Sequence, residues 1–275
     1  MTDHGLRYEV NCSILFTELP LLERPAAAKA AGFDAVEFWW PWPDQPVPAD
    51  RDVDAFVAAI EDAGVRLVGL NFFAGDLAGP DCGVLSVPDR VEQFHDNVDV
   101  TVGIGQRLGT RAFNALFGNR VDGVAPEAQD ALGRESIAVA AKAADRIGAT
   151  VLVEAVSGPK PYPLRTAAQA VAVVDDVRAA GAGNVGFLLD LYHLAANGDD
   201  LDAAIAHYAD RTAHVQLADA PGRGEPGTGS LDLQRHLGDL ARSGYAGWVG
   251  LEYKPTTATT PDSFGWLPLE RRSAG

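Results

Sequence analysis

The 275-residue sequence is poor in cysteine and in positive charge, and both shortages limit what the protein can be. It has two cysteines, Cys12 and Cys82, and no CxxC pair. This excludes a dense disulfide framework and a thiolate zinc site, and it is typical of a reducing compartment. Lysine and arginine number 22 against 38 aspartates and glutamates, which gives a formal net charge of -16. Such a surface repels polyanions, so we expect no nucleic-acid partner.

Long apolar runs are also missing. No run approaches the roughly 20 residues that cross a bilayer, and residues 1–10 lack the basic start and apolar core of a signal peptide. We therefore expect a cytoplasmic protein with no membrane partner. The sequence leaves the oligomeric state open, a homo-oligomer included.

What the sequence does contain is a regular alternation of short β-rich and Ala-rich segments, which predicts βαβ units and a parallel sheet. Eight candidate strands occupy residues 7–13, 35–40, 66–72, 111–116, 150–156, 185–191, 213–219 and 248–254. Eight strands, each followed by a helix, in roughly 250 residues indicate an α/β fold, a single (β/α)8 TIM barrel over residues 1–275. A doubly wound open sheet is the alternative, but no G-x-G-x-x-G follows the first strand.

Four consecutive predicted strands end in a side chain that offers an oxygen ligand: Glu154, Asp190, Gln216 and Glu252. The C-terminal ends of barrel strands open on one face, so these side chains can converge there. Three carboxylates in one place would raise one another's pKa values unless a cation lay between them. An all-oxygen set suits Mg2+ or Mn2+. The plainer alternative is that each acid caps the following helix or faces solvent.

Two further side chains belong to the loops that follow these strands. His193 lies three residues after Asp190, just above the predicted rim and within reach of a substrate oxygen. A lone histidine is more often structural, and the adjacent acid is what favours a functional role. Arg223 stands in the Gly-rich loop 218–230, where a guanidinium suits a substrate carboxylate or phosphate. A solvated loop charge is the alternative.

Three other residues follow from strand position alone. Glu37 ends the second strand and can point into the barrel mouth. Lys254 follows Glu252 by two residues and is expected on the same side, as a partner of substrate or of a carboxylate and not as a Schiff base. His214 precedes Gln216 by two residues, and we interpret it as a hydrogen-bonded core histidine.

Five stretches resemble the hydroxypyruvate isomerase family of xylose-isomerase-like TIM barrels, from about Asn11 to Pro255. They are "NCSILFTELPLLERPAAAKAAGFDAVEFWWP", "NFFAGD", "LDLYH", "VQLADAPGRGEPGTG" and "GWVGLEYKP". The chain departs from the pattern at residues 155–157, Ala-Val-Ser where the family often has Pro-Ile-Asn. It departs again at Gly222, where the family often has His.

The resemblance implies roles for the residues already singled out. The divalent metal ion, Mg2+ or Mn2+, would be bound by Glu154, Asp190, Gln216 and Glu252. Of these, Glu154 and Glu252 would also be the catalytic proton donor and acceptor. His193 and Arg223 would contact substrate. We also expect Glu37, Lys254 and Asn71, which opens "NFFAGD", among the substrate-binding residues, although the resemblance does not assign them.

The function that the resemblance implies is the metal-dependent interconversion of hydroxypyruvate and tartronate semialdehyde through an enediolate, with a small hydroxy-carbonyl acid as substrate. A 2-oxo-tetronate isomerase, a ketose 3-epimerase and a non-catalytic sugar-acid-binding barrel stay open as alternatives. An apurinic-site endonuclease would need a cluster of metal-binding histidines and a basic face, and neither is evident in the sequence.

Overall fold

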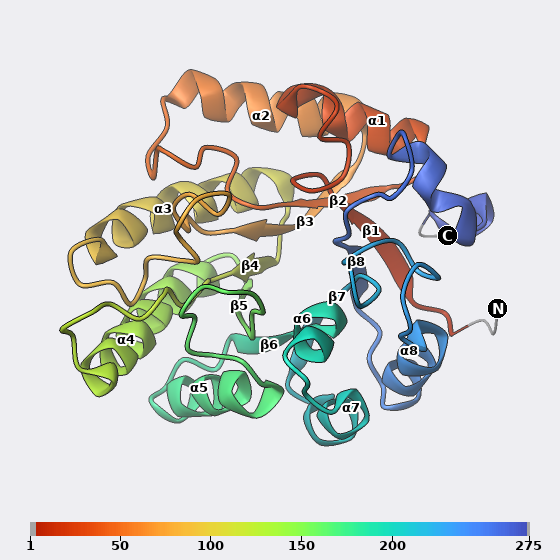
Figure 1. Cartoon of the computed structure of the whole chain (residues 1–275). Coiled ribbons are helices and arrows are strands. Elements are labelled where there is room, and N and C mark those ends of the chain that lie inside the picture. The colour runs from red at the N-terminus through yellow and green to blue at the C-terminus, as the bar shows by residue number, and fades with distance from the viewer. Residues whose placement is uncertain (1–3, 274–275) are drawn as a thin grey trace.

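A computed structural model describes residues 4–273 and confirms the predicted fold class (Figure 1). Eight parallel strands close into a barrel in chain order, with β8 paired to β1. They are β1 (Arg7–Asn11), β2 (Ala35–Phe38), β3 (Arg66–Asn71), β4 (Ala112–Asn114), β5 (Thr150–Glu154), β6 (Val185–Asp190), β7 (Thr212–Leu217) and β8 (Trp248–Leu251). Each ends one to three residues earlier than predicted, so Glu252 follows β8 instead of lying within it.

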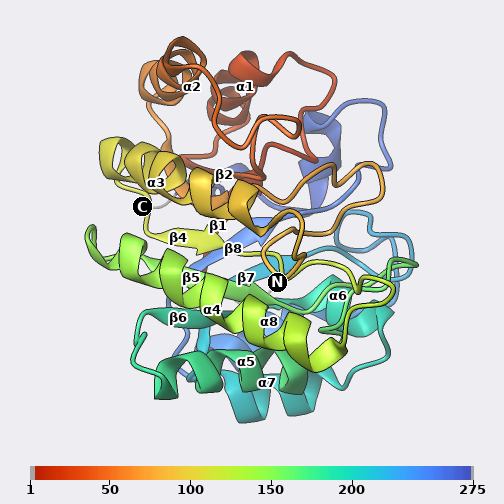
Figure 2. The ribbon, with the colours of Figure 1, turned by 90° about the vertical axis from the view of Figure 1, so that its left-hand side faces the viewer.

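Helices surround the barrel, and the side view in Figure 2 shows this outer layer. They are α1 (Arg24–Ala30), α2 (Asp50–Ala63), α3 (Val91–Leu108), α4 (Pro126–Asp145), α5 (Ala167–Ala179), α6 (Leu191–Ala196), α7 (Leu201–Tyr208) and α8 (Leu233–Arg242). None of the helices in residues 4–273 is long and apolar enough to cross a membrane.

The chain departs from the regular strand–helix pattern after β8. Up to residue 273 the chain forms only two 3-10 helices there, η2 (Pro261–Trp266) and η3 (Leu269–Arg271), in addition to the 3-10 turn η1 (Leu21–Glu23) near the N-terminus. Prolines recur in this last segment and interrupt an α-helix. The segment still packs against the outer layer of the barrel, because the Phe264 ring lies 4.9 Å between centroids from Phe33, which is in the turn between α1 and β2.

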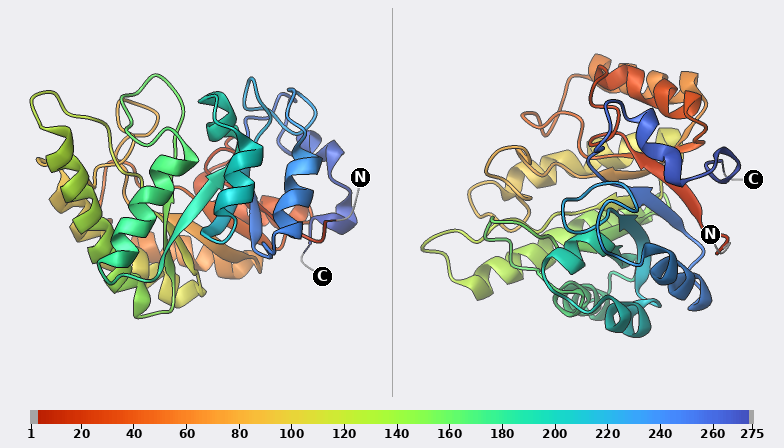
Figure 3. Two further views of the ribbon diagram at one scale, coloured as in Figure 1. Left: turned by 90° about the horizontal axis from the view of Figure 1, so that it is seen from below. Right: turned by 45° about the vertical axis from the view of Figure 1, so that its right-hand side comes forward.

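The barrel presents its two longest connections, residues 72–90 after β3 and 218–232 after β7, at the same end (Figure 3, left, upper edge). This is the end at which the strands finish, and it is where (β/α)8 barrels place their active sites. The strands beneath it are buried on both faces, as in other parallel sheets; all six residues of β6 are buried. The rigid strands therefore fix whatever side chains stand at their ends.

Two glycines of α3 test how tightly the helix layer packs on the barrel. A Cβ on Gly105 would lie 2.3 Å from Cζ of the fully buried Phe113, whereas a Cβ on Gly103 would have nothing within 4 Å. We expect Gly105→Ala to lower the free energy of unfolding by about 1–3 kcal/mol through overpacking. Gly103→Ala should raise it by up to about 1 kcal/mol through helix propensity. Urea denaturation of the two variants side by side measures both, and equal stabilities would contradict this packing.

Candidate active site

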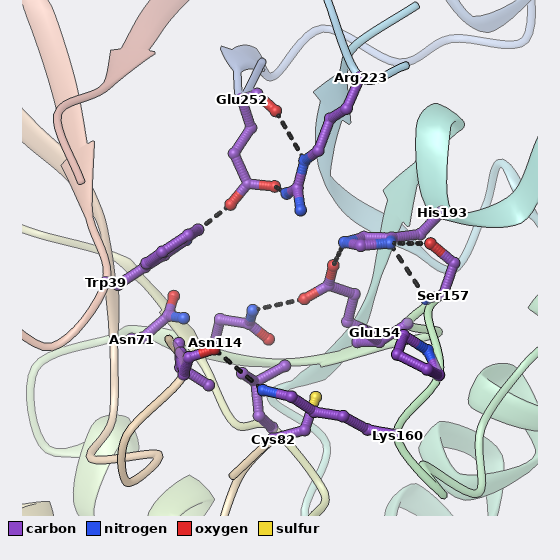
Figure 4. A pocket seen from close by; sticks show the side chains of 14 residues that line it. Trp39, Asn71, Cys82, Asn114, Glu154, Ser157, Lys160, His193, Arg223 and Glu252 are labelled. Atoms are coloured by element: carbon purple, nitrogen blue, oxygen red, sulfur yellow. Dashed lines mark hydrogen bonds and ion pairs between the residues drawn. The ribbon is translucent and has the colours of Figure 1, made fainter. Parts of the chain in front are cut away.

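The strand ends open into a cavity of about 160 Å³ (Figure 4). Five of the predicted site residues line it, and they come from the ends of five different strands or from the segments that follow them: Asn71, Glu154, His193, Arg223 and Glu252. The other lining residues are Trp39, Leu77, Cys82, Asn114, Leu116, Val156, Ser157, Pro159 and Lys160. Both predicted catalytic carboxylates therefore face one small space.

Glu154 ends β5 and is buried. Its Oε2 accepts a hydrogen bond from Nδ2 of Asn114, the last residue of β4, at 2.8 Å. Its Oε1 lies 3.8 Å from Nε2 of His193, which is itself 3.9 Å from Oδ2 of Asp190. Ligand atoms of Glu154, Asp190 and His193 all lie within 4.8 Å of one another. The structure thus brings these three predicted residues together.

Asp190 both caps a helix and belongs to this cluster. Its Oδ1 accepts a hydrogen bond from the backbone N–H of His193 at 2.9 Å and caps α6. The alternative prediction, that Asp190 caps the following helix, is therefore correct for its Oδ1 atom. A carboxylate has a second oxygen, and Oδ2 lies on the His193 side of the cluster.

Glu252 is held by three partners. Its Oε1 accepts hydrogen bonds from Nε1 of Trp39 at 2.6 Å and from Nδ2 of Asn11 at 3.1 Å. Its Oε2 pairs with the guanidinium of Arg223, whose Nε also donates to the Glu252 carbonyl at 3.3 Å. Arg223 has a left-handed backbone with φ 62°, which typically costs of order 1–3 kcal/mol for a residue other than glycine. The fold keeps this strained backbone where the guanidinium meets Glu252.

Burial raises the pKa values of all three carboxyls. For Glu154, burial comes first and the charges of Glu252 and Asp190 add to it, so its pKa lies well above the usual range. Burial also raises the pKa values of Asp190 and Glu252, although the nearby Arg223 guanidinium lowers both. One guanidinium facing three carboxyls leaves this cluster short of positive charge.

His193 is neutral, and its tautomer follows from its contacts. Burial lowers its pKa to about 3. Its Nδ1 accepts a hydrogen bond from the backbone N–H of Ser157 at 3.0 Å and lies 2.7 Å from the Ser157 hydroxyl oxygen. A backbone N–H can only donate, so Nδ1 is the acceptor and Nε2 carries the proton. That N–H faces Glu154 and Asp190.

A second polar cluster lies deeper in the barrel, below the cavity. His214 Nε2 is 2.9 Å from Oε2 of Glu37 and 3.3 Å from Oε1 of Glu9. Burial lowers the pKa of His214, but its hydrogen bonds to Glu37 and Glu9 outweigh burial and raise the pKa to about 10. Burial raises the pKa of Glu37, yet the His214 contact outweighs burial and the net pKa is lowered. His214 is thus the hydrogen-bonded core histidine that the sequence predicts.

Glu37 connects this deeper cluster to the cavity. It accepts hydrogen bonds from Nε2 of Gln216 at 2.6 Å and from Nδ2 of Asn11 at 3.0 Å, and Asn11 also donates to Glu252. The other end of the Gln216 amide, Oε1, is buried and has no hydrogen-bond partner within residues 4–273. Gly250 makes room for the carboxylate, because a Cβ there would lie 2.8 Å from Glu37 Oε1.

Two predicted substrate-binding residues therefore lie outside the cavity. Glu37 is beneath it, bound to its neighbours, and Lys254 is exposed on the loop after β8. The prediction for Lys254 used the alternation of side chains along a strand, which stops where β8 ends at Leu251. Asn114 was missed although, like the acids, it ends its strand. Lys160 lies six residues beyond β5 in a loop, where no strand pattern indicates its position.

Comparisons with known proteins match this chain to a xylose isomerase-like TIM barrel family and to hydroxypyruvate isomerases. A family model for the xylose isomerase-like TIM barrel matches residues 25–269. A putative hydroxypyruvate isomerase from Streptomyces coelicolor is 58% identical over 272 residues, 98% of each chain. The hydroxypyruvate isomerase of Escherichia coli is 31% identical over 264 residues, 95% of this chain and 98% of that protein.

Among solved structures, a crystal structure described as an AP endonuclease, family 2, from Brucella melitensis has a TM-score of 0.85. It is 32% identical in sequence, and the match covers 95% of this chain and 97% of that one. The resemblance thus extends over nearly the whole barrel.

The closeness of the Glu154, Asp190 and Glu252 carboxyls should lower the free energy of unfolding of the metal-free protein. Glu154 binds its proton more tightly when folded, so its ionisation opposes folding above its ordinary pKa of 4.5. We expect Glu154→Gln to raise the free energy of unfolding by about 1–3 kcal/mol at about pH 7, a gain that vanishes below about pH 4. Denaturation with a chelator present measures it. The exposed Glu135→Gln on α4 serves as control, and a less stable Glu154→Gln would contradict this account.

The two buried histidines should differ in charge without either of them titrating. With pKa values of about 3 and about 10, His193 stays neutral and His214 stays doubly protonated between about pH 5 and about pH 8. Long-range proton–nitrogen NMR spectra of the imidazoles distinguish the two forms, with His193→Gln and His214→Gln used to assign the signals. A midpoint near the ordinary value of 6.5 for either ring would contradict the contacts described.

Proposed function

The chain belongs to the hydroxypyruvate isomerase family of xylose isomerase-like TIM barrels, and on this premise we propose that it is a metal-dependent isomerase that interconverts hydroxypyruvate and tartronate semialdehyde. The observation that carries the proposal is the pair Glu154 and Glu252, which face the same small cavity from different strand ends (Figure 4). Two such groups allow one to remove a proton at one carbon while the other returns a proton at the neighbouring carbon.

The four side chains at or next to the ends of β5 to β8 fit a hard divalent cation, and two of them, Glu154 and Glu252, line the cavity itself. Glu154, Asp190 and Glu252 are buried carboxyls with raised pKa values, and the Gln216 amide oxygen has no hydrogen-bond partner in the described part of the chain. These four oxygen donors suit Mg2+ or Mn2+. Such an ion, when bound, polarises a carbonyl group and acidifies the adjacent C–H bond.

The protein's own groups then divide the proton transfers. One of Glu154 and Glu252 removes a proton from the carbon that bears the hydroxyl, which gives an enediolate, and the other returns a proton to the former carbonyl carbon. The hydroxyl proton passes to the former carbonyl oxygen, so the product is an aldehyde with a new hydroxyl group beside it. Asn114 orients the carboxyl of Glu154, while Trp39 and Asn11 orient the carboxyl of Glu252. His193 presents Nε2–H to a substrate oxygen, and Arg223 contacts substrate from the Glu252 side.

The cavity favours a small substrate. Its volume of about 160 Å³ is well below the roughly 300–1,000 Å³ of pockets that hold drug-sized ligands. The apolar part of its lining includes Leu77, Leu116 and Val156. A three-carbon acid suits this space, and four-carbon acids and ketoses are the competitors that a substrate panel must include.

An apurinic-site endonuclease, the activity in the description of the Brucella structure, suits this chain less well. Within residues 4–273, each cluster of potential metal ligands contains a single histidine. The net charge of -16 opposes approach of a DNA backbone.

Proton NMR of hydroxypyruvate in D2O tests the proposal. With chelator-stripped protein we expect no turnover, and with Mg2+ restored we expect tartronate semialdehyde. Glu154→Gln and Glu252→Gln should each lower kcat by about 100- to 10,000-fold, since each removes a proton-transfer group; the exposed Glu135→Gln should not lower it.

The other outcomes separate substrate from chemistry. If deuterium enters hydroxypyruvate but no tartronate semialdehyde forms, the enediolate chemistry is supported and hydroxypyruvate is not the substrate. The substrate would then be sought among 2-oxo-tetronates and ketoses. No exchange and no product with either Mg2+ or Mn2+ would contradict the proposed function.

A further inference from the structure

Lys160 is a cation on the cavity wall to which neither the sequence nor the resemblance gives a role. It lies in the loop between β5 and α5, half-buried, and it lines the same cavity as Glu154 and Glu252. Its Nζ donates hydrogen bonds to the backbone carbonyls of Leu77 at 2.9 Å and Asp81 at 2.6 Å. Both acceptors belong to the loop after β3, so the side chain is held in place across the cavity rim.

The charge of Lys160 has no anionic partner among the residues that the structure describes. Its two acceptors are neutral carbonyls, and the nearby Asp81 carboxylate pairs with Arg90 at 2.7 Å and accepts from the backbone N–H of Asp76. Carbonyl oxygens solvate an ammonium group without cancelling its charge. An ammonium also has three N–H donors, and the two bonds to carbonyls leave one for a ligand.

Arg223, the other cation of the cavity, is already engaged. Its guanidinium pairs with Glu252 and is close enough to Asp190 to lower the pKa values of both carboxyls. An anion that enters the cavity therefore finds the compensated guanidinium beside the carboxyls and the uncompensated ammonium of Lys160 away from them.

We propose that Lys160, and not Arg223, binds the carboxylate of the substrate, and that this contact selects hydroxy-carbonyl acids over neutral sugars of the same length. The inference rests on the proposed function for the identity of the substrate. It adds the group that distinguishes an acid from a ketose in a cavity whose proton-transfer residues would serve both.

The test compares an acid with a neutral molecule of the same size. Dihydroxyacetone is hydroxypyruvate with a hydroxymethyl group in place of the carboxylate. We expect Lys160→Met to raise KM for hydroxypyruvate by about 10- to 100-fold with little change in kcat, to leave the kinetics with dihydroxyacetone unchanged, and to leave Mn2+ affinity unchanged in calorimetry. Lys160→Arg should recover part of the lost affinity. The matched control is Lys142→Met, an exposed lysine on α4.

A binding measurement separates this inference from the proposed reaction. Glycerate has the carboxylate but no carbonyl to isomerise, so its affinity for Mg2+-loaded protein by calorimetry reports binding alone. If glycerate binds in a Lys160-dependent way and no tartronate semialdehyde forms from hydroxypyruvate, the inference stands and the proposed reaction fails.

Three outcomes would overturn the inference. In the first, hydroxypyruvate is isomerised but Lys160→Met leaves its KM unchanged. In the second, Lys160→Met weakens hydroxypyruvate and dihydroxyacetone equally, as expected if the lysine only ties two loops together. In the third, wild-type protein binds neither hydroxypyruvate nor glycerate.

Discussion

The constraint on which this barrel depends is the burial of carboxylates, each of which needs a positive charge nearby. The deeper cluster meets that need within itself, because protonated His214 pairs with Glu37, while burial and the Glu37 charge hold the pKa of Glu9 well above its usual range. The cluster at the cavity does not, since within residues 4–273 Arg223 is the one permanent cation that faces the carboxyls of Glu154, Asp190 and Glu252. We call the deeper cluster, whose charges are balanced, the closed cluster, and the cavity cluster, which has an excess of carboxyls, the open cluster. An added cation would be stabilised at the open cluster.

The closed cluster also supports the open one. Glu37 fixes the amide of Gln216 through its Nε2 and leaves Oε1 without a protein partner, and it shares Asn11 with Glu252. This arrangement needs space inside the barrel, which Gly250 provides. Gly250, two residues before Glu252 in "WVGLEYKP", thus supports Glu252 indirectly. A side chain at Gly250 would displace the Glu37 carboxylate, which holds Asn11, and Asn11 donates a hydrogen bond to Glu252.

The sequence predicted the barrel and its strand-end acids because two rules are strong: parallel strands finish on one face, and acids are almost never fully buried unless they are paired. The same rules could not place residues outside strands. Lys254 was misplaced once β8 stopped at Leu251, and Lys160 was missed because its position depends on two carbonyls of a loop some 80 residues earlier in the chain. Loop side chains are positioned by tertiary contacts that carry no periodic signal.

Charge balance links the proposed reaction to the proposed role of Lys160. If the carboxyls of Glu154, Asp190 and Glu252 are all ionised, a divalent ion and Arg223 would together offset their three negative charges. No positive charge would then be left for a substrate anion. Lys160 supplies that charge. When a glutamate then takes a proton from the substrate, negative charge moves from the carboxylate to the enediolate without changing the total charge inside the cavity. A neutral ketose would leave Lys160 uncompensated at every step, whereas an acid pairs with it from binding to release.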